Sequence, residues 1–254
     1  MHHDQGALGS VANDRSTERQ VEILKMMGCN SIRVTHNPAS DELIDACNKH
    51  GILVIDEAFD GWVAPKNSNS NDYSKWFNKK IEDGNEIMGA AENMTWAQFD
   101  LTAMIERGQN DPAIIMWSLG NEMWEGTGGY SDDYKTAQDN LVKWAKAADT
   151  TRPVTTGDNK LKSNETGAIT LGQELQKAGG IHGMNYSQEW KNYAGKTHYD
   201  MIHEAYPEWC MYGSETASAV NSRGIYKGMG SQTDYGDYDL TSYDTSAVGW
   251  GATA

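Results

Sequence analysis

Apolar positions along the chain alternate between two spacings, and this alternation predicts helices and strands in turn. Segment 16–28 has helical spacing, with a capping-box pattern of Thr17 and Gln20 near its start. A second helix is expected between Ser40, its N-cap, and Gly51, which ends it. Further helices are predicted at 95–108, 134–149, 171–178 and 199–205.

Short apolar runs of strand length lie between these helices. The run Ile52–Asp56 is continuous, as expected for a parallel strand that is buried on both faces. The polar segment 63–93 is expected to be a long loop or an excursion over a rim. Other strands are predicted at 30–34, 113–118, 152–158, 180–187 and 208–215.

This order of elements indicates an α/β fold. Helices of about a dozen residues that alternate with strands of about five require a parallel sheet with right-handed crossovers. A (β/α)8 TIM barrel fits best, because the doubly wound alternative lacks both a G-x-G-x-x-G segment after a first strand and a P-loop.

Both ends of the sequence fall short of a complete barrel. Only residues 1–4 stand where a first strand would end, and the closing segment 243–254 has no apolar run of strand length. We therefore expect an incomplete barrel in which most of strand 1 and all of strand 8 are missing. Residues 1–254 are interpreted as one partial barrel domain, since barrels of about this length are commonly single units.

Composition and charge narrow the class of ligand. The net charge of −15 suits neither the phosphates of nucleic acid nor an anionic membrane surface, and no apolar run is long enough to cross a bilayer. Three widely spaced cysteines indicate neither a zinc site nor a disulfide framework. Nine tryptophans and twelve tyrosines offer aromatic faces on which sugar rings stack. A neutral polar ligand is therefore expected, while compartment and oligomeric state stay open.

Polar residues gather where the predicted strands end. In barrels of this class the chemistry lies at the carboxyl ends of the strands, so the last residues of each strand are candidates. Two of them, Glu57 and Asp60, are expected only to shape the rim. The full set is His2, His3, Asp4, Arg33, Thr35, His36, Asn37, Asp56, Glu57, Asp60, Asn121, Glu122, Asp158, Asn159, Asn185, Tyr186, Ser214 and Glu215.

Glu122 and Glu215 differ from the other candidates because each directly follows an apolar strand and has polar neighbours. Strands 4 and 7 of a barrel face one another across its mouth, and cleavage of a glycosidic bond requires two facing carboxyl groups. Glu122, near two tryptophans in the sequence, is expected to have a raised pKa and to act as the acid. Glu215 must stay ionised to attack, and Tyr186 and Arg33 could supply the donors it needs. The sequence leaves open whether the gap is about 5 to 5.5 Å, as in retention, or about 6.5 to 9.5 Å, as in inversion.

Six segments, in their order along the chain, resemble the catalytic barrel of glycoside hydrolase family 2, the group of β-galactosidases, β-glucuronidases and β-mannosidases. They are MHHDQGALG, GCNSIRVTHNP, VIDEAFDGW, IIMWSLGNE, GMNY and YGSET, and together they span nearly the whole chain. The resemblance implies a retaining double displacement with Glu122 as general acid/base and Glu215 as nucleophile.

The resemblance also implies residues around the sugar. Asn121 would contact the 2-hydroxyl, Tyr186 would hold the nucleophile, and Arg33 would lie beneath it. His36, in the Thr-His-Asn-Pro motif, would lie at the sugar, and His2 near the start of the barrel. Purely structural roles are the alternatives: an ion-pair partner for Arg33, a core phenol for Tyr186 and a rim residue for His2.

Departures from the family pattern shape further expectations. Some members bind magnesium just after strand 3, but this chain reads FDGWV there, so no metal and no cofactor is predicted. The strand-8 tryptophan and the β-sandwich domains that precede the barrel in the family are not in this sequence. We therefore expect catalysis in a longer parent chain that supplies those domains, and weak or absent activity for this chain alone.

A β-galactoside is the favoured substrate, because DEAFDGW and the insert after it are similar to bacterial β-galactosidases. A β-glucuronidase is the alternative within the family, although the segment 221–223 reads Asn-Ser-Arg where the glucuronidase motif ends in Lys. Mannose, linkage and aglycone stay open.

Two alternatives lie outside this reaction. A metal-dependent barrel hydrolase could use His2, His3 and His36, but it would leave Glu122 without a role. An inactive sugar-binding fragment would stack its ligand on the tryptophans Trp62, Trp117 and Trp124.

Overall fold

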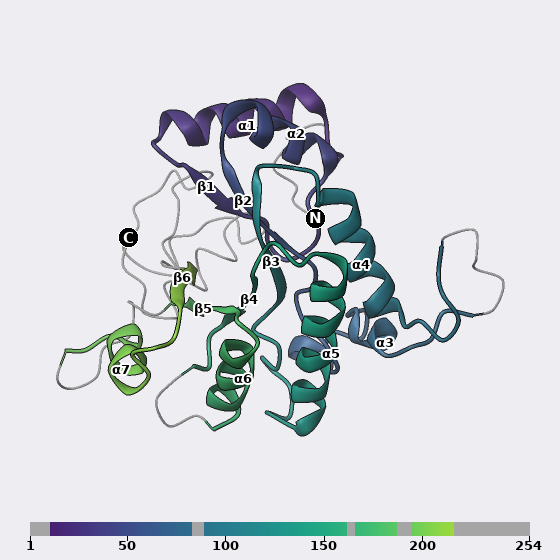
Figure 1. Ribbon diagram of the computed structural model, residues 1–254, viewed down its shortest axis with the longest axis vertical. Coiled ribbons are helices and arrows are strands. Elements are labelled where there is room, and N and C mark those ends of the chain that lie inside the picture. The colour runs from purple at the N-terminus through teal and green to yellow at the C-terminus, as the bar shows by residue number, and fades with distance from the viewer. Residues whose placement is uncertain (1–10, 83–88, 162–165, 187–194, 216–254) are drawn as a thin grey trace, which may run out of the picture.

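Six parallel strands form one sheet in the computed structural model, which describes residues 11–82, 89–161, 166–186 and 195–215. The strands lie in the sheet in their order along the chain, and each pairs in parallel with the next (Figure 1). They are β1 (Ser31–Arg33), β2 (Leu53–Glu57), β3 (Ile114–Asn121), β4 (Val154–Asp158), β5 (Ile181–Asn185) and β6 (Met211–Glu215). A parallel sheet wound in chain order is typical of a barrel, so the predicted incomplete (β/α)8 barrel is confirmed as the fold class.

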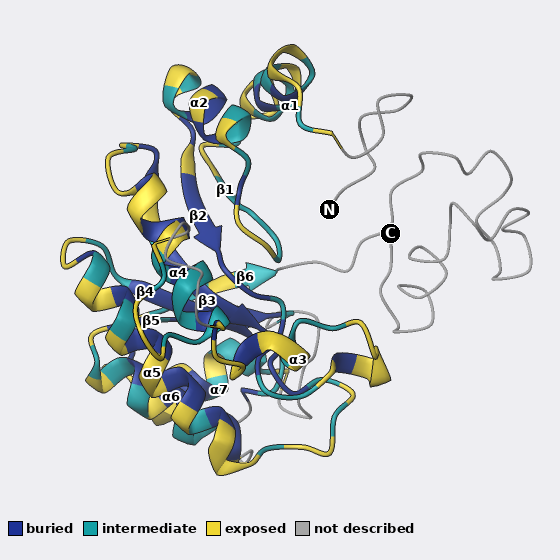
Figure 2. Ribbon diagram, turned by 90° about the vertical axis from the view of Figure 1, so that its right-hand side faces the viewer, coloured by how far each residue is buried: buried dark blue, intermediate teal, exposed yellow. Residues whose placement is uncertain are grey.

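Helices lie outside the sheet, in the connections between neighbouring strands. They are α2 (Asp41–His50), α4 (Trp96–Gly108), α5 (Asp132–Ala148), α6 (Thr166–Lys177) and α7 (His198–Ala205), with α1 (Asp14–Met26) before β1. Buried residues concentrate on the strands and on the helix faces toward them (Figure 2). None of the helices in the described segments is long and apolar enough to span a membrane.

The predicted N-cap is confirmed for α2 but not for α1. For α2, the Ser40 side chain accepts a hydrogen bond from a first-turn amide, and Gly51 has a φ of 68° in the left-handed region that favours glycine. For α1 the predicted capping box is wrong. Asn13 caps this helix by accepting from the Ser16 amide, and Thr17 lies buried inside the helix. Asparagine is a strong N-cap residue, and it starts the helix earlier than the apolar periodicity indicated.

The polar segment 63–93 is more structured than the predicted long loop. It contains two short helices, η2 (Lys66–Ser68) and α3 (Ser74–Phe77). The Phe77 ring is 1% exposed and packs edge-on against Phe59, with 5.6 Å between ring centroids. Part of this segment therefore folds back onto the chain that follows β2.

The three tryptophans considered as stacking surfaces are buried instead. Trp62 and Trp117 are 0% exposed, and Trp124 is 5% exposed. Trp62 Nε1 donates to the Leu119 carbonyl, and Trp117 Nε1 donates to Asp149 Oδ2. Buried indole N–H groups need such partners, so these rings are core residues, and a sugar-binding surface made of them is excluded.

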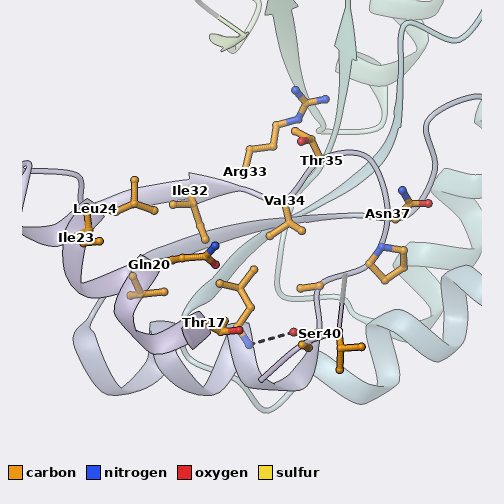
Figure 3. A pocket seen from close by; sticks show the side chains of 16 residues that line it. Thr17, Gln20, Ile23, Leu24, Ile32, Arg33, Val34, Thr35, Asn37 and Ser40 are labelled. Carbon is orange, nitrogen blue, oxygen red and sulfur yellow. Dashed lines mark hydrogen bonds between the residues drawn. The ribbon is translucent and has the colours of Figure 1, made fainter. Parts of the chain in front are cut away.

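A cavity of about 780 Å³ lies between α1 and β1. Its walls are mainly apolar and include Leu24 of α1, Ile32 of β1 and Val34. Figure 3 shows Ile32 and Val34 pointing toward α1, whereas the guanidinium of Arg33 points to the other side of the strand. Side chains alternate along a strand, and this alternation directs Arg33 to the side of the sheet that holds the polar candidates.

Candidate active site

Glu57 is the centre of a buried polar cluster on that side of the sheet. Arg33 donates to Glu57 Oε2 from Nε at 2.8 Å and from Nη2 at 2.6 Å. Ser118 Oγ donates to the same oxygen at 2.6 Å, and His36 Nδ1 lies 2.6 Å from Oε1. The Glu57 side chain is 0% exposed, so the expectation that it shapes the rim is wrong.

Glu215, the last residue of β6, joins this cluster through Arg33. Arg33 Nη1 donates to Glu215 Oε1 at 3.0 Å, and the Tyr186 hydroxyl donates to Oε2 at 2.5 Å. His36 Nε2 lies 3.7 Å from Oε1. Both donors that the sequence offered for Glu215 therefore contact it. The side chain is 21% exposed, which leaves part of it open to a ligand.

Two asparagines link Arg33 to Glu122. Asn121 Oδ1 accepts from Arg33 Nη2 at 3.0 Å and from Asn185 Nδ2 at 2.9 Å. Asn185 Nδ2 also donates to Glu122 Oε1 at 2.8 Å, and Asn185 Oδ1 accepts from Ser214 Oγ at 2.6 Å. Asn185 is a strand-end residue that the sequence did not distinguish from its neighbours. In the structure it connects Glu122 to the rest of the cluster.

Glu122 and Tyr186 have left-handed backbone conformations, with φ of 44° and 57°. Such conformations are uncommon outside glycine and gather at functional sites. Each residue directly follows the asparagine that ends its strand. The backbone amide of each donates a hydrogen bond to a carbonyl of the next strand. The Glu122 amide lies 2.8 Å from the Gly157 carbonyl, and the Tyr186 amide 2.5 Å from the Glu215 carbonyl. These two bonds hold both residues in position at the end of the sheet.

Burial raises the pKa of Glu122 to about 8, because desolvation penalises its charged form. The neighbouring Glu125 carboxyl and the charge of Glu215 raise this pKa further, whereas the hydrogen bond from the side-chain amide of Asn185 lowers it. A carboxyl group with this pKa keeps its proton at neutral pH, as a general acid must.

Two strand-end carboxylates point away from the cluster. Asp56 precedes Glu57 on β2, and successive strand residues face opposite sides. Asp56 Oδ1 accepts from the Ala39 amide at 2.8 Å, and burial raises the pKa of Asp56 to about 6. Asp158 follows Gly157, which faces the cluster. Neither carboxylate is therefore available to a ligand of this site.

Six of the seven residues expected to carry the site lie in this one network, and five of them are connected around Arg33. They are Arg33, His36, Asn121, Tyr186 and Glu215. Glu122 joins them through Asn185. His2 lies outside the described residues, as do His3 and Asp4.

A group of possible metal ligands within the described residues lies on other elements. Glu18 and Glu22 of α1 and His50 of α2 have ligand atoms within 4.8 Å of one another. Arg15 donates to both carboxylates, and Lys49 Nζ lies 2.5 Å from Glu18 Oε1. Two cations already neutralise these carboxylates, so the group is an ion-pair network.

Gly157 of β4 faces this cluster, and a larger residue there is expected to displace it. A Cβ at this position would lie 2.6 Å from Arg33 Nη2, 3.0 Å from Asn121 Oδ1 and 3.1 Å from Asn185 Oδ1. We expect Gly157→Ala to lower the free energy of unfolding by about 1 to 3 kcal/mol, the usual cost of overpacking a well-packed site, as measured by denaturant unfolding. Gly128→Ala is the matched control, because a Cβ there meets nothing within 4 Å. Equal stability of the two variants would contradict the tight packing around Gly157.

Comparisons with known proteins identify the family of this chain. The family model described as glycosyl hydrolases family 2, TIM barrel domain, matches residues 1–233. The β-galactosidase BoGH2A of Bacteroides ovatus is 30% identical over 292 aligned positions, which cover 100% of this chain and 31% of that protein. The β-glucuronidase of Mus musculus is 29% identical over 168 positions, which cover 66% of this chain and 22% of that protein.

A solved structure of the same family also matches this chain. The crystal structure of a glycosyl hydrolase family 2 member from Bacteroides cellulosilyticus matches with a TM-score of 0.65 and 32% identity, and the match covers 86% of this chain and 24% of that one. This chain thus spans less than a third of the length of these relatives. The family match extends over nearly the whole sequence and includes every strand end described above, so the chain belongs to glycosyl hydrolase family 2, within its TIM-barrel domain.

Proposed function

We propose that this barrel, as part of a longer chain, hydrolyses terminal β-galactosides with retention of configuration. Glu215 attacks the anomeric carbon while the bond to the leaving oxygen breaks, and Glu122 gives its proton to that oxygen. In the second step Glu122, now a carboxylate, takes a proton from water. The oxygen of that water displaces Glu215 and releases the sugar.

The observation that carries this proposal is the contrast between the two carboxyl groups. Glu215 accepts from a guanidinium and a phenol and is partly exposed, which suits an anionic nucleophile. Glu122 is 7% exposed and has a raised pKa, which suits a proton donor. Both belong to one hydrogen-bonded network at the carboxyl ends of the strands, where barrel enzymes carry their chemistry.

The residues around the two carboxyl groups have supporting roles in this proposal. Arg33 and Tyr186 orient Glu215, and Asn121 contacts the sugar 2-hydroxyl beside the acid. His36 contacts the sugar from the nucleophile side, since its Nε2 lies 3.7 Å from Glu215. His2 is proposed to act near the start of the barrel, on the resemblance alone.

A galactoside is proposed because BoGH2A, which matches the chain from end to end, is a β-galactosidase. The β-glucuronidase of Mus musculus matches a shorter part of the chain at similar identity, so a glucuronide is the alternative substrate. Activity is proposed for the longer chain that the length of the relatives indicates, and weak or absent activity for these 254 residues alone.

Covalent labelling tests the nucleophile and the stereochemical course together. We expect an activated 2-deoxy-2-fluoro-β-galactoside to inactivate the full-length protein and to leave one sugar on the peptide that contains Glu215, as detected by mass spectrometry. Glu215→Gln should abolish the label, since an amide does not form the glycosyl ester. Glu208→Gln, at an exposed position before β6, should keep it. A label on another residue, or hydrolysis with inversion by NMR, would refute the proposal.

A further inference from the structure

Two carboxylates and one imidazole of the site are partly exposed, whereas the cations that pair with the carboxylates are nearly buried. The side chains of Glu215, His36 and Asp60 are 21%, 29% and 46% exposed. Arg33 and Lys66, which pair with the carboxylates, are 6% and 9% exposed. Within the described residues, a ligand at this face therefore meets negative charge before it meets positive charge.

Asp60 is held in place by two donors that use the same oxygen. Lys66 Nζ lies 2.8 Å from Asp60 Oδ1, and Asn121 Nδ2 donates to this oxygen at 3.3 Å. Lys66 Nζ also donates to the Asn121 carbonyl at 3.3 Å, at the end of β3. No hydrogen bond from the described residues reaches Asp60 Oδ2, so the second oxygen of a fixed carboxylate is free to accept from a ligand.

His36 lies on this face next to Glu215, whose Oε1 is 3.7 Å from His36 Nε2. The other ring nitrogen, Nδ1, contacts the Glu57 carboxylate, which only accepts, so Nδ1 carries a proton. Nε2 lies 3.5 Å from Asn121 Nδ2, the same nitrogen that donates to Asp60. Asn121 thus contacts both Asp60 and His36, and His36 in turn lies beside Glu215.

We propose that Asp60, positioned by Lys66, is a specificity-determining residue of this site. Its free oxygen accepts a hydrogen bond from a ring hydroxyl of a neutral glycoside, and its charge repels the carboxylate of a glucuronide. The inference rests on the proposed function, because it assumes that a β-glycoside binds beside Glu215 and His36. It adds the reason why a galactoside is accepted and a glucuronide is rejected.

The test measures binding, so that it does not depend on turnover. Two non-hydrolysable ligands with the same aglycone, 4-nitrophenyl 1-thio-β-galactoside and 4-nitrophenyl 1-thio-β-glucuronide, are titrated calorimetrically into the longest natural form of the protein. The wild type should bind the galactoside more tightly. Asp60→Asn keeps the shape but removes the charge, and it should lower the ratio of the glucuronide Kd to the galactoside Kd by about tenfold or more, the usual effect of one charged hydrogen bond.

Two further variants separate specificity from folding. Asp60→Asn leaves the Lys66 ammonium buried without its carboxylate, and the double variant Asp60→Asn/Lys66→Met removes that charge as well. The double variant should show the same change in the Kd ratio. Asp45→Asn removes an exposed carboxylate on α2 and should leave the ratio unchanged.

A wild type that binds the glucuronide as tightly as the galactoside, or that binds neither, would overturn the inference. An unchanged ratio in both Asp60 variants would also overturn it. The proposed reaction fails by a different result, namely the absence of the fluorosugar from Glu215. A shifted binding ratio without that label would support the role of Asp60 while rejecting the double displacement.

Discussion

Replacing Glu122 by alanine is expected to lower kcat/KM for a β-galactoside with a poor leaving group by about 10² to 10⁴, the contribution of general acid–base catalysis. A dinitrophenyl galactoside, whose leaving group needs no proton, should lose much less in the glycosylation step. Azide should restore turnover of this activated substrate by attacking the glycosyl-enzyme and giving a β-galactosyl azide.

The same variant is expected to change the pH profile. Because burial raises the pKa of Glu122 to about 8, the acid form is present at neutral pH, and the wild type should lose kcat/KM as pH rises through that range. The alanine variant has no such group and should lack this alkaline limb. Glu106→Ala, at an exposed position of α4, should keep the wild-type profile. Equal losses for good and poor leaving groups would show that Glu122 does not protonate the leaving oxygen.

Replacing Glu57 by glutamine is expected to destabilise the protein by about 3 to 5 kcal/mol, the usual result of removing one partner of a buried ion pair. The substitution keeps the shape of the side chain but leaves the Arg33 guanidinium buried with Glu215 as its remaining carboxylate. Denaturant unfolding of the full-length protein, followed through the transition of this domain, measures the change.

Two comparisons make the result for Glu57 specific. Glu57→Asp keeps the charge and should lose less stability than Glu57→Gln. Glu106→Gln removes an exposed carboxylate, where a loss below about 1 kcal/mol is expected. A similarly small loss for Glu57→Gln would mean that the contacts around Arg33 contribute little to the fold.

The sequence was sufficient for the fold class and for the neighbourhood of the site, for one physical reason. Parallel strands wound in chain order bring all their carboxyl ends to the same edge, so residues far apart in the chain are neighbours once the strands are identified. Arg33 and Glu215 are 182 positions apart and form a hydrogen bond of 3.0 Å. Their closeness therefore follows from the order of the strands alone, without any distance information in the sequence motifs.

The direction of individual side chains was harder to predict. Asp56 and Glu57 are adjacent carboxylates, and only the register of β2 decides that Glu57 enters the cluster. Strict alternation would put Ser118 and Asn121, three positions apart, on opposite faces of β3. An irregularity of the β3–β4 pairing between these two residues lets both side chains reach the cluster.

The amino-acid composition also could not predict which large side chains are buried. An abundance of tryptophan is equally compatible with sugar-stacking surfaces and with a core, and Trp62 and Trp117 belong to the core. The same holds for Lys66, a charged residue in a polar segment that the fold nevertheless covers. The partners that permit such burial, Asp60 and the Asn121 carbonyl, come together only in three dimensions.

The left-handed conformations of Glu122 and Tyr186 have a consequence for how this architecture can diversify. The backbone amide of each donates a hydrogen bond to the adjoining strand, so the central sheet fixes where the two residues stand. Asp60 and Lys66 belong instead to the excursion formed by residues 58–73, between β2 and α3. A lineage can therefore remodel that excursion, and with it the repertoire of glycosides it admits, while the reaction centre is inherited intact.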